Sequence, residues 1–260
     1  MQLPERATLP TTPSFRLDGR RALVAGGGRG IGAAAAAALA DAGAAVTVVA
    51  RSAAEVEAVA DQLRARGTDC DAAALDVTQS SSLAAFVRQR GPFDILVNSA
   101  GTNRPASLTE TSDRDVDDVL RLNVNAALYL AREVARGLLR IGRGGSLITV
   151  SSQMGHVGGI ERSVYCASKH AVEGMTKALA WELGPYGIRV NTVCPTFIET
   201  ELTAPMLRDA EFRAYVESKI ALGRIGRLED LMGAIVFLAS DAAAMVTGSA
   251  LMVDGGWTAT

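Results

Sequence analysis

Cysteine, histidine and aromatic residues are scarce in this chain of 260 residues. It has three cysteines, two histidines and 5% aromatic residues. Three scattered cysteines without a CxxC pair give no disulfide or zinc framework and suit a reducing, cytoplasmic compartment. His156 and His170 have no metal-ligand spacing, so no metal site is expected. The shortage of aromatic residues argues against base-stacking platforms, and the net charge of −2 gives no electrostatic case for binding nucleic acid or an anionic membrane.

A long apolar run is missing as well. The alanine-rich run at residues 33–40 is too short to span a membrane. Residues 1–14 carry three prolines and no apolar signal-peptide core, so we expect a flexible leader. Residues 15–260 show neither a break in composition nor an internal repeat, and we expect them to form a single domain.

What the sequence does contain is a regular alternation of short apolar runs and helical segments. Strands are predicted at residues 21–25, 45–50, 71–75, 94–97, 145–150, 188–193 and 250–253. Helices are predicted at residues 33–42, 53–66, 80–89, 112–139, 164–183 and 228–240. This alternation predicts an α/β fold, a three-layer, doubly wound parallel sheet of about seven strands with helices on both faces. Residues 196–222 follow no single period and are expected to form a mobile substrate lid, with an ordered pair of surface helices as the alternative.

A glycine-rich turn with GxxxGxG spacing occupies residues 26–32, between the first predicted strand and helix. Glycines there permit positive φ and bring backbone N–H groups close to a pyrophosphate at the helix N-terminus. About 20 residues further on, the ribose-reading position offers Arg51 and Ser52 where an NAD-binding protein would have a carboxylate. Together with Arg29, Arg51 would attract a 2′-phosphate, so NADP(H) is predicted over NAD(H). The alternative is that both arginines are plain surface charges.

Tyr165 and Lys169 stand one turn apart in the predicted helix at residues 164–183. A phenol normally loses its proton near pH ~10, and an ammonium nearby favours phenolate and lowers that pKa. The pair is therefore a candidate acid/base unit for a hydroxyl proton. An ordinary solvated pair on a helix face is the alternative.

Several further motifs recur in a fixed order. They are Ala25-Gly26-x-x-x-Gly30-Ile31-Gly32, Asp76-Val77, Asn98-Ser99-Ala100-Gly101, Asn123-Val124, Ser151-Ser152, Tyr165-x-x-x-Lys169, Asn191, Pro195 and Val253-Asp254-Gly255-Gly256. With these motifs, residues 15–257 resemble the short-chain dehydrogenase/reductase family, and within it gluconate 5-dehydrogenase-like and 3-oxoacyl-carrier-protein reductase-like members. The resemblance implies a Rossmann-type sheet, a nicotinamide cofactor and interconversion of a ketone and a secondary alcohol. Ala25, Ser99 and Thr196 depart from the family pattern without removing a catalytic group.

The resemblance also implies roles for individual residues. Tyr165 would be the general acid/base, and Lys169 would lower its pKa and hold the nicotinamide ribose. Ser152 would bind the substrate oxygen, with Ser151 as the alternative. Asn123 would support a proton-relay water, and a helix-distorting structural role is open for it too.

A larger set is implied to contact the cofactor. The expected residues are Gly26, Gly28, Arg29, Gly30, Ile31, Gly32, Arg51, Ser52, Asp76, Val77, Asn98, Ala100, Gly101, Tyr165, Lys169, Pro195, Ile198 and Thr200. Asp76 would bind the adenine amino group, with a helix or turn cap as the alternative. Ile198 and Thr200 would contact the nicotinamide carboxamide.

The substrate wall is expected to be rich in polar side chains. Its expected residues are Ser152, Gln153, Met154, His156, Asn103, Arg104 and Met206. Such a wall indicates a sugar acid or polyol as substrate. A 3-oxoacyl-carrier-protein reductase activity is an alternative, and an inactive NADP(H)-sensing binding protein is another.

The family resemblance implies a homotetramer that pairs the long helices near residues 123–139 and 165–183. The second helix carries an apolar stripe that would suit burial in such an interface. The stripe consists of Ala171, Val172, Ala178, Leu179 and Leu183. The alternative is that it faces only its own sheet.

Overall fold

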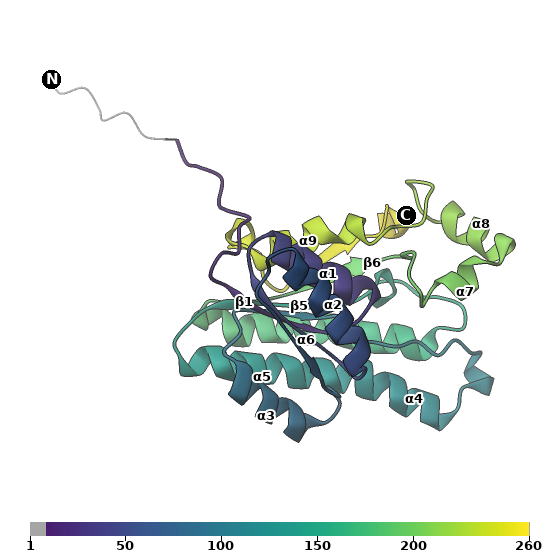
Figure 1. The fold of residues 1–260 in the computed structure, drawn as a ribbon. Helices are drawn as coiled ribbons and strands as arrows, with labels where there is room; N and C mark the ends of the chain where they lie inside the picture. The colour runs from purple at the N-terminus through teal and green to yellow at the C-terminus, as the bar shows by residue number, and fades with distance from the viewer. Residues whose placement is uncertain (1–8, 260) are drawn as a thin grey trace.

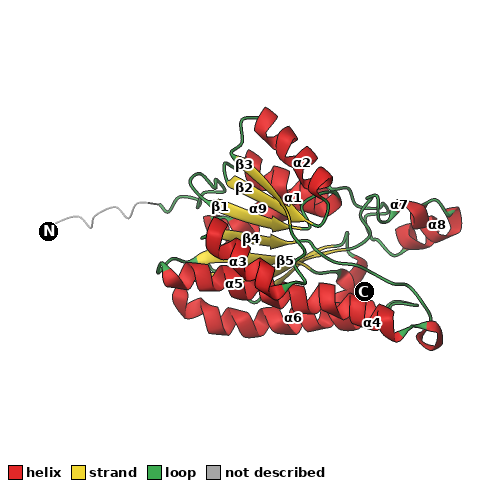
Figure 2. Ribbon diagram, turned by 60° about the horizontal axis from the view of Figure 1, so that its bottom comes forward, coloured by secondary structure: helices red, strands yellow, loops and turns green. Residues whose placement is uncertain are grey.

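One parallel sheet between two layers of helices forms the protein (Figures 1 and 2). The computed structural model describes residues 9–259. The strands are β1 (Arg21–Ala25), β2 (Ala45–Ala50), β3 (Cys70–Ala74), β4 (Ile95–Asn98), β5 (Gly145–Val150), β6 (Ile188–Pro195) and β7 (Ala250–Val253). Their order is β3-β2-β1-β4-β5-β6-β7, and all neighbouring pairs run parallel. The predicted doubly wound fold is confirmed.

The helices divide between the two faces of the sheet. They are α1 (Gly30–Asp41), α2 (Ala53–Ala65), α3 (Ser80–Arg90), α4 (Asp113–Leu120), α5 (Ala126–Arg140), α6 (Ser163–Leu183), α7 (Ala204–Leu207), α8 (Ala210–Ser218) and α9 (Glu229–Ala239). In Figure 2, α1, α2 and α9 cover one face, whereas α3, α5 and α6 cover the other. Two separate apolar clusters, one under each layer, follow from this arrangement.

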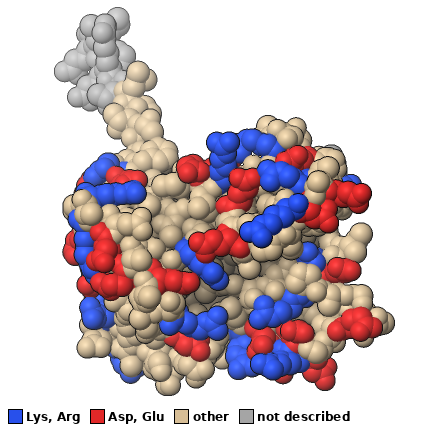
Figure 3. All heavy atoms as spheres, turned by 45° about the vertical axis from the view of Figure 1, so that its right-hand side comes forward, with Lys and Arg blue, Asp and Glu red and all other residues tan. Residues whose placement is uncertain are grey.

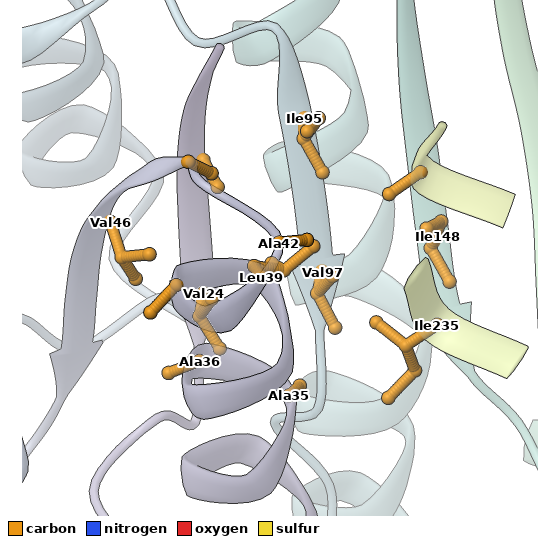
Figure 4. Close-up of a cluster of buried hydrophobic side chains, with 14 of the residues drawn as sticks. Val24, Ala35, Ala36, Leu39, Ala42, Val46, Ile95, Val97, Ile148 and Ile235 are labelled. Carbon is orange, nitrogen blue, oxygen red and sulfur yellow. The ribbon is translucent and has the colours of Figure 1, made fainter. Parts of the chain in front are cut away.

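Small side chains let α1 lie close to the sheet. Figure 4 shows Ala35, Ala36 and Leu39 of α1 packed over Val24 of β1, all fully buried. Buried apolar surface stabilises a fold by about 25 cal/mol per Å², so this layer anchors the turn that precedes α1. The glycine-rich turn is thereby held at the carboxyl end of β1.

The predicted strand bounds agree with the structure to within two residues. The predicted helix at residues 112–139 is interrupted, because a π-helical segment, Arg121–Asn125, separates α4 from α5. Helix α1 begins at Gly30, three residues earlier than predicted. Of the predicted leader, residues 9–14 are exposed and lie outside any helix or strand, and residues 1–8 lie outside the described residues.

Helices α7 and α8 lie beyond the edge of the main layers, at the right of Figure 1. They pack with the segment before them around a third small cluster, which contains Leu207, Val216, Ile220 and Ile225. On the face shown in Figure 3, basic and acidic side chains are interspersed. Within residues 9–259, no helix has the length and apolar character needed to cross a membrane.

Candidate active site

The carboxyl ends of four neighbouring strands bring the predicted cofactor residues to one edge of the sheet. The glycine turn follows β1, Arg51 follows β2, Asp76 comes two residues after β3, and Asn98 ends β4. Asn98 is buried, and its Oδ1 accepts a hydrogen bond from the Ala100 amide at 3.1 Å. In open parallel sheets this edge is where nucleotides bind.

Two glycines of the turn have no room for a side chain. A Cβ on Gly26, whose φ is +74°, would lie 2.7 Å from the amide nitrogen of Ala100. A Cβ on Gly32 would overlap the carbonyl oxygen of Gly26. Because Gly30, Ile31 and Gly32 form the first turn of α1, their N–H groups belong to the end of the helix that attracts anions. The residues present thus fit the pyrophosphate of a dinucleotide.

The polar residues around this turn already have partners. Arg29 is exposed, and its Nη1 lies 3.4 Å from Glu201 Oε2. Ser52 caps α2 by accepting from the Glu55 amide at 3.3 Å. Asp76 accepts from the amide and the hydroxyl of Thr78 at 3.0 and 2.8 Å.

The electrostatic surroundings of Asp76 include the predicted phosphate reader. Burial acts to raise the pKa of Asp76, but the hydrogen bonds from Thr78 and Gln79 and the positive charge of Arg51 bring it below its ordinary value. Asp76 is therefore a capping carboxylate, and Arg51 is close enough to influence it. Val77 packs into the apolar cluster beside it.

A cleft of about 410 Å³ opens beside the same edge of the sheet. The predicted residues that line it are Ile31, Gly101, Asn103, Ser152, Gln153, Met154, Tyr165, Lys169, Pro195, Ile198, Thr200 and Met206. Asn103 Oδ1 and Thr196 Oγ1, both buried in its wall, have no hydrogen-bond partner within residues 9–259. A ligand with hydroxyl groups would satisfy them.

Ser152 and Tyr165 face one another in this cleft. Burial raises the pKa of Tyr165 to about 12, although a hydrogen bond with Ser152 opposes the rise. The Ser152 hydroxyl also donates to Gln153 Oε1 at 2.7 Å, so the buried Gln153 orients it. The neighbouring Ser151 also lines the cleft, but its hydroxyl lies beside Gly155, on the side of α6 that carries Glu173.

In the ligand-free protein, Lys169 does not lower the pKa of the Tyr165 phenol as expected. Lys169 Nζ lies 5.5 Å from the centre of the Tyr165 ring and donates to the carbonyl of Val150 at 2.9 Å. Burial lowers the pKa of Lys169 to about 8, although Cys194 and Glu173 act to raise it. The charge that acts to lower the Tyr165 pKa comes from Arg162, and burial outweighs it.

Asn123 sits in the π-helical segment, behind the floor of the cleft. Its amide donates to the Thr102 carbonyl at 2.9 Å and to Ser168 Oγ at 3.0 Å, and its Oδ1 accepts from the Thr102 amide at 2.8 Å. The π-helical turn is the distortion that turns this side chain inward. A structural role for Asn123 is therefore evident in the geometry.

Two residues expected in the substrate wall do not line the cleft. Arg104 turns outward, and its Nε lies 3.6 Å from Asp115 Oδ1. His156 follows a 3₁₀ turn, Gln153–Gly155, that directs it away from the cleft toward β6. Its Nε2 lies 3.6 Å from Cys194 Sγ and 3.7 Å from Glu173 Oε1. Neither Arg104 nor His156 lines the cleft in this structure, so contact of either residue with the substrate stays a prediction.

Arg162 is the lining residue that the sequence analysis missed. Only 9% of it is exposed, and its guanidinium donates to the Glu161 carbonyl at 3.1 Å and reaches Met206 Sδ at 4.0 Å. Within residues 9–259 it forms no ion pair with a carboxylate. Arg162, Tyr165 and Lys169 follow i, i+3, i+7 spacing, the pattern of one helix face. This spacing in the sequence could have predicted that Arg162 lies on the same side as Tyr165 and Lys169.

Comparison with known proteins places this geometry in a family. A family model described as enoyl-(acyl carrier protein) reductase matches residues 25–258. Gluconate 5-dehydrogenase of Gluconobacter oxydans is 38% identical over 94% of this chain and 96% of its own length. A 3-oxoacyl-(acyl-carrier-protein) reductase of Pseudomonas aeruginosa is 39% identical over 92% and 98%.

Solved structures that are similar to this chain include a protein of the same kind as one of these relatives. A gluconate 5-dehydrogenase from Burkholderia cenocepacia, crystallised with NADP and tartrate, superposes with a TM-score of 0.91. It is 37% identical, and the match covers 95% of this chain and 98% of that structure. The chain belongs to the short-chain dehydrogenase/reductase family, as its motifs predicted.

Proposed function

We propose that this chain is an NADP(H)-dependent oxidoreductase that interconverts a ketone and a secondary alcohol on a sugar acid. The observation that supports the substrate class is Arg162, a buried guanidinium. Among residues 9–259 it has no carboxylate partner, and the cleft that it lines contains hydrogen-bonding groups left unpaired by those residues. A buried charge is costly when left unpaired, and a carboxylate is the group that an arginine binds in bidentate fashion. A sugar acid brings both that carboxylate and hydroxyl groups for Asn103 and Thr196.

The reactive groups that we assign are Ser152, Tyr165 and Lys169, with Asn123 behind them. In reduction, Ser152 and Tyr165 donate hydrogen bonds to the carbonyl oxygen, and Tyr165 gives it a proton. In oxidation the same phenol accepts the hydroxyl proton. NADP(H), when bound, supplies or accepts the hydride. Because substrate and cofactor are held in one cleft, orientation contributes much of the acceleration.

The cofactor assignment follows from the charges beside the glycine turn. Arg29 and Arg51 would face a 2′-phosphate, and no carboxylate occupies the position of Arg51 at the end of β2. Structural neighbours with 37%, 40% and 38% identity were solved with NADP bound. These findings support NADP(H) as the preferred cofactor of this chain.

A substrate panel with the Arg162→Met variant tests the substrate class. For the wild-type enzyme with NADP⁺ or NADPH, we expect kcat/KM for sugar acids to exceed that for uncharged polyols and β-ketoacyl thioesters. A hydrogen bond to a charged group contributes about 1.5–3 kcal/mol, so Arg162→Met should lower the ratio of sugar-acid to polyol kcat/KM about 10- to 100-fold. An effect of Arg162 on Tyr165 would change kcat/KM for both substrates equally, so it cancels in this ratio.

Arg104→Met is the matched control, because Arg104 is exposed and turned toward Asp115. That variant should keep the wild-type ratio. A wild-type preference for a β-ketoacyl thioester would identify the alternative ketoreductase, and no turnover on any ketone would favour a binding protein. A ratio unchanged by Arg162→Met would refute the carboxylate assignment.

We also propose that residues 196–222 act as a lid. This segment contributes Thr196, Phe197, Leu202 and Met206 to the wall of the cleft. Helices α7 and α8 within it pack around a small apolar cluster that also includes Ile225 and Trp257 from outside the segment, so lid movement would change the packing against these two residues. Limited proteolysis between α7 and α8 should slow when NADPH and substrate are both bound, and cleavage at an unchanged rate would contradict the lid.

We further propose a homotetramer located in the cytoplasm. Trp181 on α6 is 86% exposed, and Ala171 and Ala178 on that helix are exposed with it, whereas Val172 and Leu183 of the predicted stripe are buried against the chain's own sheet. All three cysteines are free, which suits a reducing compartment. Light scattering should give about four times the chain mass of 27.0 kDa.

A further inference from the structure

Three side chains that the proposed reaction does not use converge behind the catalytic segment. Cys194 Sγ lies 3.6 Å from His156 Nε2 and 3.4 Å from Glu173 Oε1, and His156 Nε2 lies 3.7 Å from Glu173 Oε1. They come from three places, the turn after residues 153–155, helix α6 and strand β6. None of the three lines the cleft.

The triangle formed by these three atoms has the dimensions of a metal site. A tetrahedral ion with bonds of about 2.0–2.3 Å separates its nitrogen, oxygen and sulfur ligands by about 3.3–3.6 Å. The three observed separations of 3.4, 3.6 and 3.7 Å are already close to this. An ion could therefore bind with little movement of the ligands.

The immediate surroundings of the triangle also point to a ligand. Ser151 is buried beside the triangle, with its hydroxyl within hydrogen-bonding reach of Cys194. Thr192 donates to Glu173 Oε2 at 3.0 Å, which fixes the carboxylate with its Oε1 toward the other two groups. Metal-binding carboxylates are commonly held in this way by an outer hydrogen bond.

The burial of Glu173 and the partial exposure of His156 are also compatible with a bound ion. The Glu173 side chain is 6% exposed and the His156 side chain 31% exposed, so the carboxylate is enclosed while the imidazole reaches solvent. An ion could enter from the His156 side. The enclosed carboxylate accepts from the Thr192 hydroxyl and the Cys194 thiol and lies within electrostatic reach of Lys169, and a cation bound at its Oε1 would add a direct charge partner.

We propose that His156, Glu173 and Cys194 bind Zn²⁺ or a similar divalent transition metal ion, with a fourth position open on the His156 side. A set of imidazole, thiolate and carboxylate ligands suits zinc or cobalt and does not suit Mg²⁺ or Ca²⁺, which take oxygen ligands. Binding exchanges the Cys194 proton for the metal ion and involves no change of oxidation state. The Cys194 thiol gives up its proton to solvent and a metal–sulfur bond forms.

This ion would join the three segments that carry the proposed catalytic groups. Glu173 lies one helical turn after Lys169, Cys194 directly precedes Pro195, and His156 closes the turn that begins at Ser152. Since the ion does not face the cleft, its expected role is structural. No metal-ligand spacing is visible in the sequence, because the three ligands lie on separate elements.

Cobalt titration of the wild-type protein tests the site directly. The protein is treated with EDTA, kept reduced, and titrated with Co²⁺ while the near-ultraviolet and visible spectrum is recorded. We expect one equivalent to produce a thiolate-to-cobalt charge-transfer band and intense tetrahedral d–d bands, which Zn²⁺ then removes. No such bands would overturn the proposal without any variant.

The chain supplies matched controls for the sulfur and nitrogen ligands. Cys194→Ser and His156→Ala should lose the charge-transfer band or weaken Co²⁺ binding at least 10-fold. Cys166→Ser and His170→Ala should retain it, since those residues lie elsewhere on α6. A band that survives Cys194→Ser, or is lost equally in Cys166→Ser, would mean adventitious binding and would refute the site.

Thermal unfolding gives a readout independent of activity. An ion present at 100 times its Kd should raise the Tm by about 5 °C, because it binds only the folded protein. Mg²⁺ and Ca²⁺ at the same concentration should leave the Tm unchanged. An equal rise with Mg²⁺ would contradict a nitrogen and sulfur ligand set.

Discussion

The two halves of the sheet edge hold their charges in different ways. In the dinucleotide half, at the ends of β1, β2 and β3, Arg29 and Arg51 are exposed, and the partner of Arg29 is a surface carboxylate. In the catalytic half, at the ends of β5 and β6 and on α6, Arg162, Lys169 and Glu173 are 9%, 5% and 5% exposed.

This difference determines how strongly each half responds to change. Exposed charges interact through water, and such pairs contribute only about 0–1 kcal/mol. Burying a charge has a large desolvation cost, and for Lys169 this burial lowers the pKa to about 8. Substitutions in the catalytic half should therefore have the larger effects.

The largest expected effect is that of Tyr165→Phe in the catalytic half. The variant loses both the proton and the hydrogen bond to the substrate oxygen, so kcat should fall at least about 10³-fold. The Kd for NADPH, measured by fluorescence, should change less than about 3-fold, because the dinucleotide half is untouched. Turnover near the wild-type rate would rule out the proposed chemistry.

A smaller effect is expected from Arg51→Ala in the dinucleotide half. Losing a charged hydrogen bond to the 2′-phosphate should lower kcat/KM for NADPH about 10- to 100-fold and leave NADH within about 3-fold. Arg66→Ala, at the exposed end of α2, is the control and should change neither value. An equal loss with both cofactors would show that Arg51 does not read the phosphate.

The dinucleotide half was also the easier half to predict from sequence. Its strands are continuous apolar runs, and Gly26 and Gly32 are required by backbone contacts that a local motif reveals. The cap of α2 by Ser52 is likewise a local feature, because capping depends only on neighbouring residues.

The catalytic half depends on contacts between distant elements, which sequence patterns do not contain. His156 was expected in the substrate wall, but the turn at residues 153–155 packs against α6 and turns it toward Cys194. The Tyr165 pKa was expected to fall because of Lys169. Burial, which no local pattern shows, raises it instead.

The smallest expected effect is a pH dependence of stability that arises from Lys169. Its pKa is about 8 in the folded, ligand-free protein and about 10.4 when unfolded. Between these values the unfolded chain binds more protons, so the free energy of unfolding rises with pH. Glu173 and Cys194, the charged or ionisable groups that act on Lys169, oppose the shift without cancelling it.

The contribution of Lys169 is largest between pH 8 and 9. The three cysteines act in the opposite direction over the same range, because burial raises the pKa of Cys70 to about 11, that of Cys194 to about 12 and that of Cys166 above its ordinary value, while thiols of the unfolded chain lose their protons near pH ~8.5. The Lys169 contribution is therefore measured as a difference between two variants. In urea unfolding of metal-free protein, the change in the free energy of unfolding from pH 8 to 9 should be about 1 kcal/mol more favourable in Lys177→Met, on an exposed face of α6, than in Lys169→Met. If the change is the same in both variants, Lys169 is not the group whose burial distinguishes the catalytic half.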